Sequence, residues 1–160
     1  MLIREAYLSR IRPFIDLPII KVLTGMRRSG KSVLLQQIRD ELLTRGIEKS
    51  QIVMLNFEAA EHIPLRDGRA LHQHLDEEAR RGEKKRYFFL DEIQEVDNWE
   101  EVLRSSLVSH NCDIYITGSN SRLLSGELAS KLAGRYVSFE VSPFSFAEYS
   151  RAHREQGSEL

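Results

Sequence analysis

One short segment, Gly25–Ser32, constrains the fold of this chain more than any other part of its sequence. The segment reads GMRRSGKS and fits the pattern G-x-x-x-x-G-K-[ST], which is typical of a phosphate-binding P-loop. In such a loop the glycines let backbone N–H groups turn toward an anion, and the helix that follows adds the positive end of its dipole. The alternative is an ordinary glycine-rich turn. A P-loop lies between a strand and a helix, so the flanking residues distinguish the two.

The residues on either side of this segment are those of a strand and a helix. Ile19–Thr24 is a short, β-branched apolar run that predicts a buried strand. Helical spacing relates three apolar residues after the segment, Leu34, Ile38 and Leu42. Gly46 is a natural C-terminal stop for that helix. The P-loop pattern therefore lies in the context that it requires.

The rest of the chain continues this alternation of strands and helices. Apolar, β-branched or aromatic runs predict further strands at residues 52–57, 87–90, 113–117 and 136–141. Helical stripes lie between them at residues 71–79, 99–107 and 123–133, and Asp97 with Glu100 predicts a capping box before the second of these helices. This alternation predicts an α/β fold of three layers, with a five-stranded, mostly parallel sheet and helices on both faces.

Polar residues gather where the predicted strands end. Gly25, Asp91 and the pair Ser119–Asn120 each follow a strand, and parallel sheets bind their ligands at the carboxyl ends of the strands. Asp91 ends a strand that we expect next to the P-loop, where its carboxylate can hold Mg²⁺ together with the Ser32 hydroxyl. Glu92 can polarise a water molecule for attack on a terminal phosphate. The alternative is that Asp91 and Glu92 merely end a strand.

Two further residues are candidates for catalysis. Asn120 can orient the attacking water or the terminal phosphate, with Ser119 as the other choice and a plain Asn/Ser turn as the alternative. Arg135 precedes the fifth strand, and it is either a surface residue or a finger that reaches the nucleotide of a neighbouring subunit. Lys31 is expected to reach the outer phosphates. The residues expected to surround the phosphates are Gly25, Met26, Arg27, Arg28, Ser29, Gly30, Lys31, Ser32 and Val33.

Composition argues against several other classes of protein. The net charge is −1, so no overall field draws the chain to nucleic acid or a membrane, and the basic run 80–86 is either a solvated loop or a local nucleic-acid patch. The single cysteine, Cys112, rules out an internal disulfide and fits a reducing compartment. No apolar run approaches the roughly 20 residues of a membrane helix. We therefore expect a cytoplasmic protein without a membrane partner.

Taken together, these motifs resemble those of the AAA+ ATPases, and in particular a prokaryotic group described as AAA domain family fourteen. GMRRSGKS corresponds to Walker A, and the strand that ends in Asp91 and Glu92 corresponds to Walker B. The pattern of this group also includes LDEIQ, a TGS turn, LxGR and a PxSFxEY run, which stand here at residues 90–94, 117–119, 132–135 and 143–149. The resemblance extends over nearly the whole chain.

The resemblance implies ATP and ADP as ligands and Mg²⁺-dependent hydrolysis, with Glu92, Asn120 and Arg135 in the catalytic roles above. It also allows a homo-oligomer and a protein or DNA partner. A slow nucleotide-dependent switch that holds such a partner is the alternative function, and a small-molecule kinase is a third, which the Glu after Asp91 disfavours. Members of this group continue beyond such a core. We therefore expect residues 1–160 to be one ATP-binding core domain, a fragment without the lid and the C-terminal domain.

Overall fold

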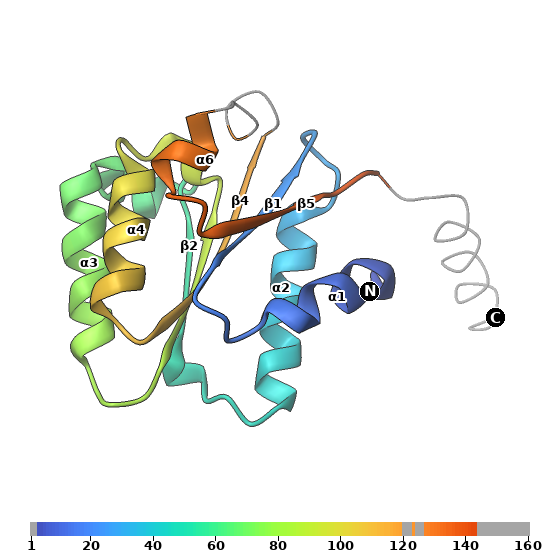
Figure 1. Ribbon diagram of the computed structural model, residues 1–160, viewed down its shortest axis with the longest axis horizontal. Helices are drawn as coiled ribbons and strands as arrows, with labels where there is room; N and C mark the ends of the chain where they lie inside the picture. Colours follow the sequence, from blue (N-terminus) through green and yellow to red (C-terminus); the bar gives the residue numbers. More distant parts are fainter. Residues whose placement is uncertain (1–2, 120–122, 124–126, 144–160) are drawn as a thin grey trace.

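The computed structural model describes residues 3–119, 123 and 127–143 of the chain (Figure 1). Its helices are α1 (Glu5–Ile11), α2 (Lys31–Thr44), α3 (Gly68–Arg80), α4 (Trp99–Ser109) and α6 (Glu127–Lys131). Its strands are β1 (Ile20–Gly25), β2 (Ile52–Asn56), β3 (Arg86–Asp91), β4 (Cys112–Ser119) and β5 (Tyr136–Glu140). Every predicted strand is present, and α1 adds a helix that the sequence pattern had not indicated. None of the helices within these ranges is long and apolar enough to cross a membrane.

All five strands form one sheet in the order β2-β3-β4-β1-β5, and every neighbouring pair is parallel. The predicted α/β fold is thereby confirmed. In this order β4 lies between the P-loop strand β1 and the strand β3 that ends at Asp91. The strands β1 and β3 still end at the same edge of the sheet, since all the strands run in one direction.

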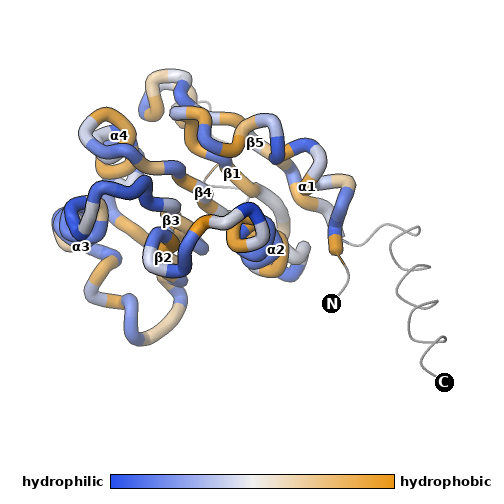
Figure 2. Tube along the Cα trace, turned by 90° about the horizontal axis from the view of Figure 1, so that it is seen from below, coloured by the Kyte–Doolittle hydropathy of each residue, from blue (hydrophilic) through white to orange (hydrophobic). Residues whose placement is uncertain are grey.

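Helices cover both faces of the sheet (Figures 1 and 2). The helices α1 and α2 pack on one face, whereas α3, α4 and α6 pack on the other. Successive strand residues alternate between the two cores: Phe88 and Leu90 of β3 lie in the core with α3 and α4, and Tyr87 and Phe89 lie in the core with α2. Because both faces of the sheet are buried, its inner strands are mostly apolar, although β1 contains Lys21 and β4 contains Asp113.

The predicted capping box at the start of α4 is wrong. The helix begins at Trp99, and the preceding Asn98 has a left-handed φ of 55° and makes no side-chain hydrogen bond to the first turn. Asp97 lies one residue further out, and its carbonyl oxygen packs against α3, where a Cβ on Gly68 would lie only 2.3 Å from it. The start of α4 is therefore fixed by this close approach of two helix ends rather than by a side-chain cap.

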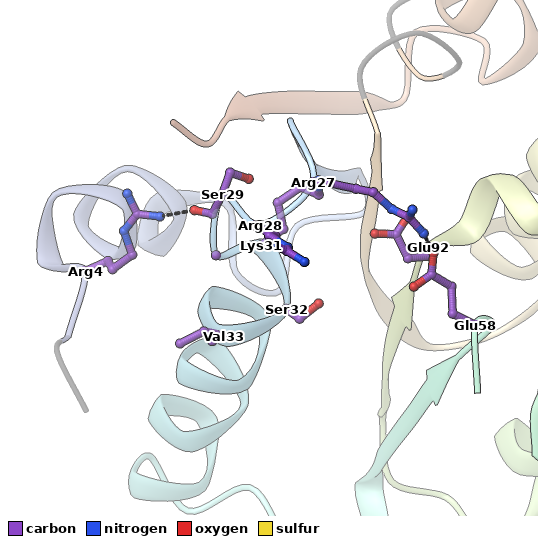
Figure 3. Close-up of a pocket in the computed structure, with 10 residues that line it drawn as sticks. Arg4, Arg27, Arg28, Ser29, Lys31, Ser32, Val33, Glu58 and Glu92 are labelled. Carbon is purple, nitrogen blue, oxygen red and sulfur yellow. Dashed lines mark hydrogen bonds and ion pairs between the residues drawn. The ribbon is translucent and has the colours of Figure 1, made fainter. Parts of the chain in front are cut away.

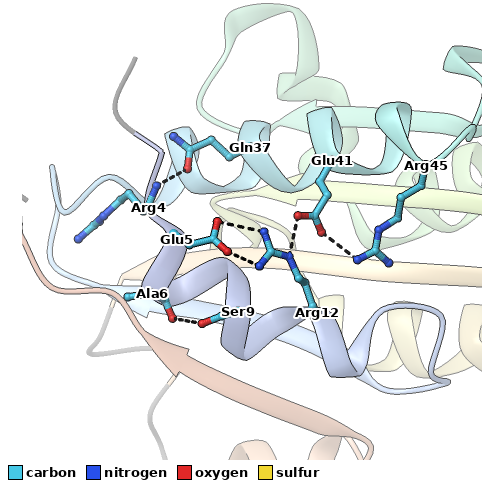
Figure 4. A network of polar contacts seen from close by, with 8 residues as sticks. All are labelled: Arg4, Glu5, Ala6, Ser9, Arg12, Gln37, Glu41 and Arg45. Carbon is cyan, nitrogen blue, oxygen red and sulfur yellow. Dashed lines mark hydrogen bonds and ion pairs between the residues drawn. The ribbon is translucent and has the colours of Figure 1, made fainter. Parts of the chain in front are cut away.

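Polar contacts join α1 to α2, as Figure 4 shows. The backbone N–H of Arg4 donates to Gln37 Oε1 at 3.1 Å, and Arg12 Nε donates to Glu41 Oε1 at 2.7 Å. The apolar side of α1 contributes three buried residues to the core, Tyr7, Leu8 and Ile11. The first helix is thus part of the same layer as the helix that follows the P-loop.

A charged pair is buried near the starts of β1 and β4. The side chains of Lys21 and Asp113 have no exposed surface and form an ion pair, and Lys21 Nζ also donates to Leu17 O at 2.8 Å. Tyr115 OH donates to Asp113 Oδ2 at 2.6 Å. Burial lowers the pKa of Lys21, and the attraction of Asp113 opposes that shift. The two charges therefore depend on each other inside the fold.

Replacing Lys21 by methionine is expected to lower the free energy of unfolding by about 3–5 kcal/mol, because Asp113 would stay buried without its partner. Urea denaturation followed by circular dichroism measures this change. The exposed pair of Lys84 and Glu48, 2.5 Å apart, supplies the control, since Lys84→Met should cost about 1 kcal/mol or less. An equal decrease in the free energy of unfolding for both variants would show that the buried pair contributes no more to stability than the exposed pair.

Candidate functional site

The loop between β1 and α2 takes a shape that its glycines allow. Gly30, which precedes α2, has a φ of 92°, and Arg28 has a φ of 65° although it is not glycine. Gly25 is required by a close approach, because a Cβ there would lie 2.3 Å from the carbonyl oxygen of Val141. The helix α2 then begins at Lys31, so its free backbone N–H groups lie at the end of the loop.

Lys31 is buried against this loop. Its Nζ donates to Gly25 O at 2.7 Å and to Met26 O at 3.0 Å. Two of the three N–H bonds of the ammonium group are thus satisfied by the loop itself, while the residue also lines the adjacent hollow. The third N–H can bind an oxygen atom of an anion in that hollow.

Asp91 connects three segments at the carboxyl edge of the sheet. Its Oδ2 accepts a hydrogen bond from Ser32 Oγ at 2.7 Å, and its Oδ1 accepts one from Thr117 Oγ1. Thr117 Oγ1 in turn accepts the backbone N–H of Glu92 at 2.9 Å. The structure therefore brings together Ser32 and Asp91, the two residues expected to hold a metal. A hydroxyl and a carboxylate oxygen are ligands that suit Mg²⁺.

Glu92 stands at the end of β3 with a strained backbone. Its φ of 58° and ψ of 52° are left-handed, which costs a residue other than glycine roughly 1 kcal/mol or more. The side-chain amide of Gln94 donates to Glu92 Oε2 at 2.5 Å. Gln94 Oε1 is buried without a hydrogen-bond partner among the described residues, and a Cβ on Gly118 would lie 2.7 Å from it. Gln94 thus holds the carboxylate of Glu92, a role that its place in LDEIQ did not reveal.

The P-loop and Glu92 line one hollow of about 610 Å³ at the carboxyl edge of the sheet (Figure 3). The lining residues are Arg4, Arg27, Arg28, Ser29, Gly30, Lys31, Ser32, Val33, Glu58 and Glu92. Most of its charge is positive and comes from the P-loop, whereas its carboxylates come from the ends of β2 and β3. A hollow of this size, with cations around a helix N-terminus, suits a ligand that carries several phosphate groups.

Two of the lining residues, Arg4 and Glu58, lie outside every sequence motif. Arg4 is almost fully buried, and its guanidinium donates to the Ser29 carbonyl and to the Ser142 carbonyl, both at 2.7 Å. Glu58 follows β2 and forms an ion pair with Arg27 at 3.0 Å. Both residues reach the site only through tertiary contacts, so no local pattern in the sequence could have identified them.

Of the remaining catalytic candidates, only Arg135 and Ser119 lie within the described residues. Asn120 lies outside the described residues, and Ser119, the other choice, is the last residue of β4. Arg135 is exposed just before β5 and lines a separate hollow together with Glu101 and Arg104 of α4. Across the described ranges, no group of three or more His, Cys, Asp or Glu side chains could hold a metal ion by itself.

The sequence is similar to those of known proteins. A family model described as an AAA domain matches residues 18–150. An uncharacterised protein of Haemophilus influenzae is 47% identical over 152 residues, which are 95% of this chain and 38% of that protein. Uncharacterised protein MJ1544 of Methanocaldococcus jannaschii is 37% identical over 136 residues, 81% of this chain and 28% of that protein. The chain thus spans well under half the length of either relative.

Solved structures share the fold. The ORC1 protein of Aeropyrum pernix, solved in complex with DNA, aligns with a TM-score of 0.64 at 12% identity, over 99% of this chain and 50% of that one. A protein of Thermotoga maritima related to the γ subunit of DNA polymerase III also has a TM-score of 0.64, at 10% identity, over 94% of this chain and 49% of that one. At such low identities these alignments establish the three-layer fold alone.

Proposed function

Because the chain belongs to the AAA domain family and so contains an ATPase-type nucleotide-binding core, we propose that it binds ATP with Mg²⁺ and hydrolyses its terminal phosphate. One observation carries this proposal. Ser32 Oγ of the P-loop donates a hydrogen bond to Asp91 Oδ2 of β3 at 2.7 Å, beside the hollow that Lys31 and Glu92 both line. An ordinary glycine-rich turn would not need that meeting, whereas phosphoryl transfer needs a phosphate cradle, a metal site and a base in one place.

Each of these parts falls to particular residues. Lys31 and the backbone N–H groups of Gly25–Val33 bind the phosphates and fix their direction. Ser32 and Asp91 would hold Mg²⁺, and their oxygen atoms fit that ion, which neutralises charge on the outer phosphates when bound. Glu92 takes a proton from the attacking water, and Gln94 orients its carboxylate. ATP is preferred to GTP in this proposal because of the family resemblance.

Isothermal titration calorimetry of the 160-residue chain with ATP and ADP tests the proposal, together with an assay of phosphate release. We expect saturable binding of both nucleotides, and phosphate release that needs Mg²⁺ and stops when EDTA is added. At an ATP concentration of 100 times Kd, binding should stabilise the fold by about 2.7 kcal/mol, which a thermal melt detects. No heat of binding and no change in Tm at millimolar ATP would contradict the proposal.

Arg135 is proposed to act on the nucleotide of a neighbouring subunit, with Asn120 as the residue that orients water or phosphate. Arg135 is exposed beside β5, an edge strand, so a second subunit can approach it. Arg135→Ala should spare ATP binding and lower turnover by about 10³-fold. Mixing this variant with Lys31→Ala subunits, which keep Arg135, should restore part of the turnover. A mixture with no more activity than its separate parts would make Arg135 an ordinary surface residue.

A slow switch that holds a protein or DNA partner is the second candidate function. The contact between Gln94 and Glu92 favours it, because that contact occupies one carboxylate oxygen of the proposed base. Single-turnover kinetics distinguish an ATPase from a switch. An enzyme with a typical kcat hydrolyses ATP about once per second or faster, whereas hydrolysis by a switch can be slower by about 10⁴-fold. Turnover of the switch should rise when its partner is added. Duplex DNA is the first partner to try, since one of the structures with this fold was solved with DNA.

A further inference from the structure

One P-loop side chain reaches away from its own loop. Arg27 extends across the mouth of the hollow to Glu58, where its Nη2 lies 3.0 Å from Glu58 Oε1 (Figure 3). Glu58 follows β2, at the edge of the sheet, so β3 and β4 both lie between the two strands that this ion pair connects. The ion pair therefore spans the site from its phosphate-binding side to its acidic side.

The surroundings of the Arg27 guanidinium are acidic. Figure 3 shows Glu92, the proposed base, beside the ion pair of Arg27 and Glu58. The pKa of Arg27 is raised, first by its hydrogen bond to Glu58 and further by the charges of Glu92 and Glu95. Arg27 and Glu92 line the same hollow as Lys31 and Ser32. The Arg27 guanidinium therefore borders the space in which Lys31 and Ser32 would hold a phosphate chain.

Stability does not explain this ion pair. The side chain of Arg27 is 81% exposed and that of Glu58 is 40% exposed, and exposed pairs of this kind contribute little to the free energy of folding. Such exposure leaves the guanidinium free to turn from a carboxylate to a phosphate. A guanidinium binds either group with two parallel hydrogen bonds, and a terminal phosphate carries more negative charge than a carboxylate.

We propose that Arg27 binds the terminal phosphate of ATP within its own chain: Glu58 holds its guanidinium until ATP binds, and the guanidinium then turns to the γ-phosphate. This inference rests on the proposed function and adds to it a residue that distinguishes ATP from ADP. ADP has no γ-phosphate, so it leaves Arg27 on Glu58. Because Arg27 acts within one chain, its contribution does not depend on the assembly that Arg135 would need.

Three variants test the proposal: Arg27→Ala, Glu58→Gln and the double variant. Calorimetry measures the affinity for ADP and for a non-hydrolysable ATP analogue with an imido bridge. The affinity ratio is the affinity for the analogue divided by the affinity for ADP. Arg27→Ala should weaken analogue binding by about 10-fold, change ADP binding by less than about 2-fold, and lower turnover by about 10²-fold or more. Glu58→Gln should raise the affinity ratio by up to about 5-fold, since it frees Arg27 from an exposed pair.

The double variant and two controls make the result specific. Without Arg27, Glu58→Gln should leave the affinity ratio unchanged, because the carboxylate then has no arginine to hold. Arg80→Ala removes another exposed ion pair, with Asp76 at 3.1 Å on α3, and should change neither affinity. Arg27→Lys keeps a positive charge and should recover part of the analogue affinity.

The outcomes separate this inference from the function on which it rests. If the wild-type chain binds neither nucleotide, the proposed function and the role of Arg27 both fail. If the wild-type chain binds both nucleotides and Arg27→Ala leaves their affinity ratio unchanged, only the role of Arg27 fails. An effect of Glu58→Gln on the ratio that persists without Arg27 would likewise refute the transfer from Glu58.

Discussion

The variant Lys31→Ala is expected to lose nucleotide binding almost completely while it keeps its fold. Lys31 Nζ is held by Gly25 O at 2.7 Å and Met26 O at 3.0 Å, so the ammonium group is already in place before a ligand arrives. Its loss removes the charge that would meet the outer phosphates and also loosens the loop whose N–H groups bind them. We expect the affinity for ATP to fall by at least about 100-fold, which is about 2.7 kcal/mol.

Calorimetry with ATP and with ADP measures this loss, and circular dichroism checks the fold. Leu34, Leu35, Ile38 and Leu42 of α2 pack in the core, so the helix should form without Lys31. The control is Lys84→Ala, which removes an exposed lysine paired with Glu48 and should leave affinity within about 2-fold. A folded Lys31→Ala variant with unchanged ATP affinity would mean that the glycine-rich segment is only a turn.

The variant Glu92→Gln should bind ATP and Mg²⁺ normally yet hydrolyse ATP at least about 100-fold more slowly, as expected when a general base is lost. Glutamine has nearly the shape of glutamate and can still meet the Gln94 amide with its own carbonyl oxygen. The hydrogen bonds of Asp91 to Ser32 and Thr117 do not involve the Glu92 side chain, so the metal site should be unaffected.

Single-turnover phosphate release, together with ATP titration, separates the chemical step from binding. Glu77→Gln provides a matched control, since Glu77 is exposed on α3 and lines neither the hollow of Glu92 nor that of Arg135. It should hydrolyse ATP within about 2-fold of the wild-type rate. Wild-type turnover in Glu92→Gln would assign the activation of water to another residue.

Much of the fold could be predicted because the information is local. The strand β1, its loop and α2 were expected at their observed places, since β-branched runs, glycines and helical spacing each depend on neighbouring residues. Strand order is not encoded in this way, and no local pattern in the sequence indicates that β4 lies between β1 and β3. The start of α4 was mispredicted for the same reason, because it depends on the packing of Asp97 against Gly68 of another helix.

In the candidate site too, the residues of local motifs could be predicted, whereas the residues that contact them could not. Ser32 and Asp91 were expected to meet, because a known motif and a known strand end each pointed to Mg²⁺, and the structure places them in contact. The partners of these residues were not foreseen. Thr117 and Glu58 gain their roles from contacts between elements, whereas Gln94 contacts Glu92 within a single turn, and any of the three could lie in an ordinary turn or strand end. Their residue types alone carry no signal of those contacts.

The place of β1 in the sheet has a consequence for how the domain is made. This strand leaves the ribosome before the other four strands of the sheet, yet it pairs on one side with β4 and on the other with β5, the two that follow last. Arg4, which holds the Ser29 carbonyl, also binds the Ser142 carbonyl, 138 residues away. Contacts at such sequence separations close large loops and form slowly. The strand β1, which leads into the P-loop, is therefore synthesised early but gains its hydrogen-bonded neighbours late. A nascent chain that stops short of β5 leaves one edge of β1 unpaired.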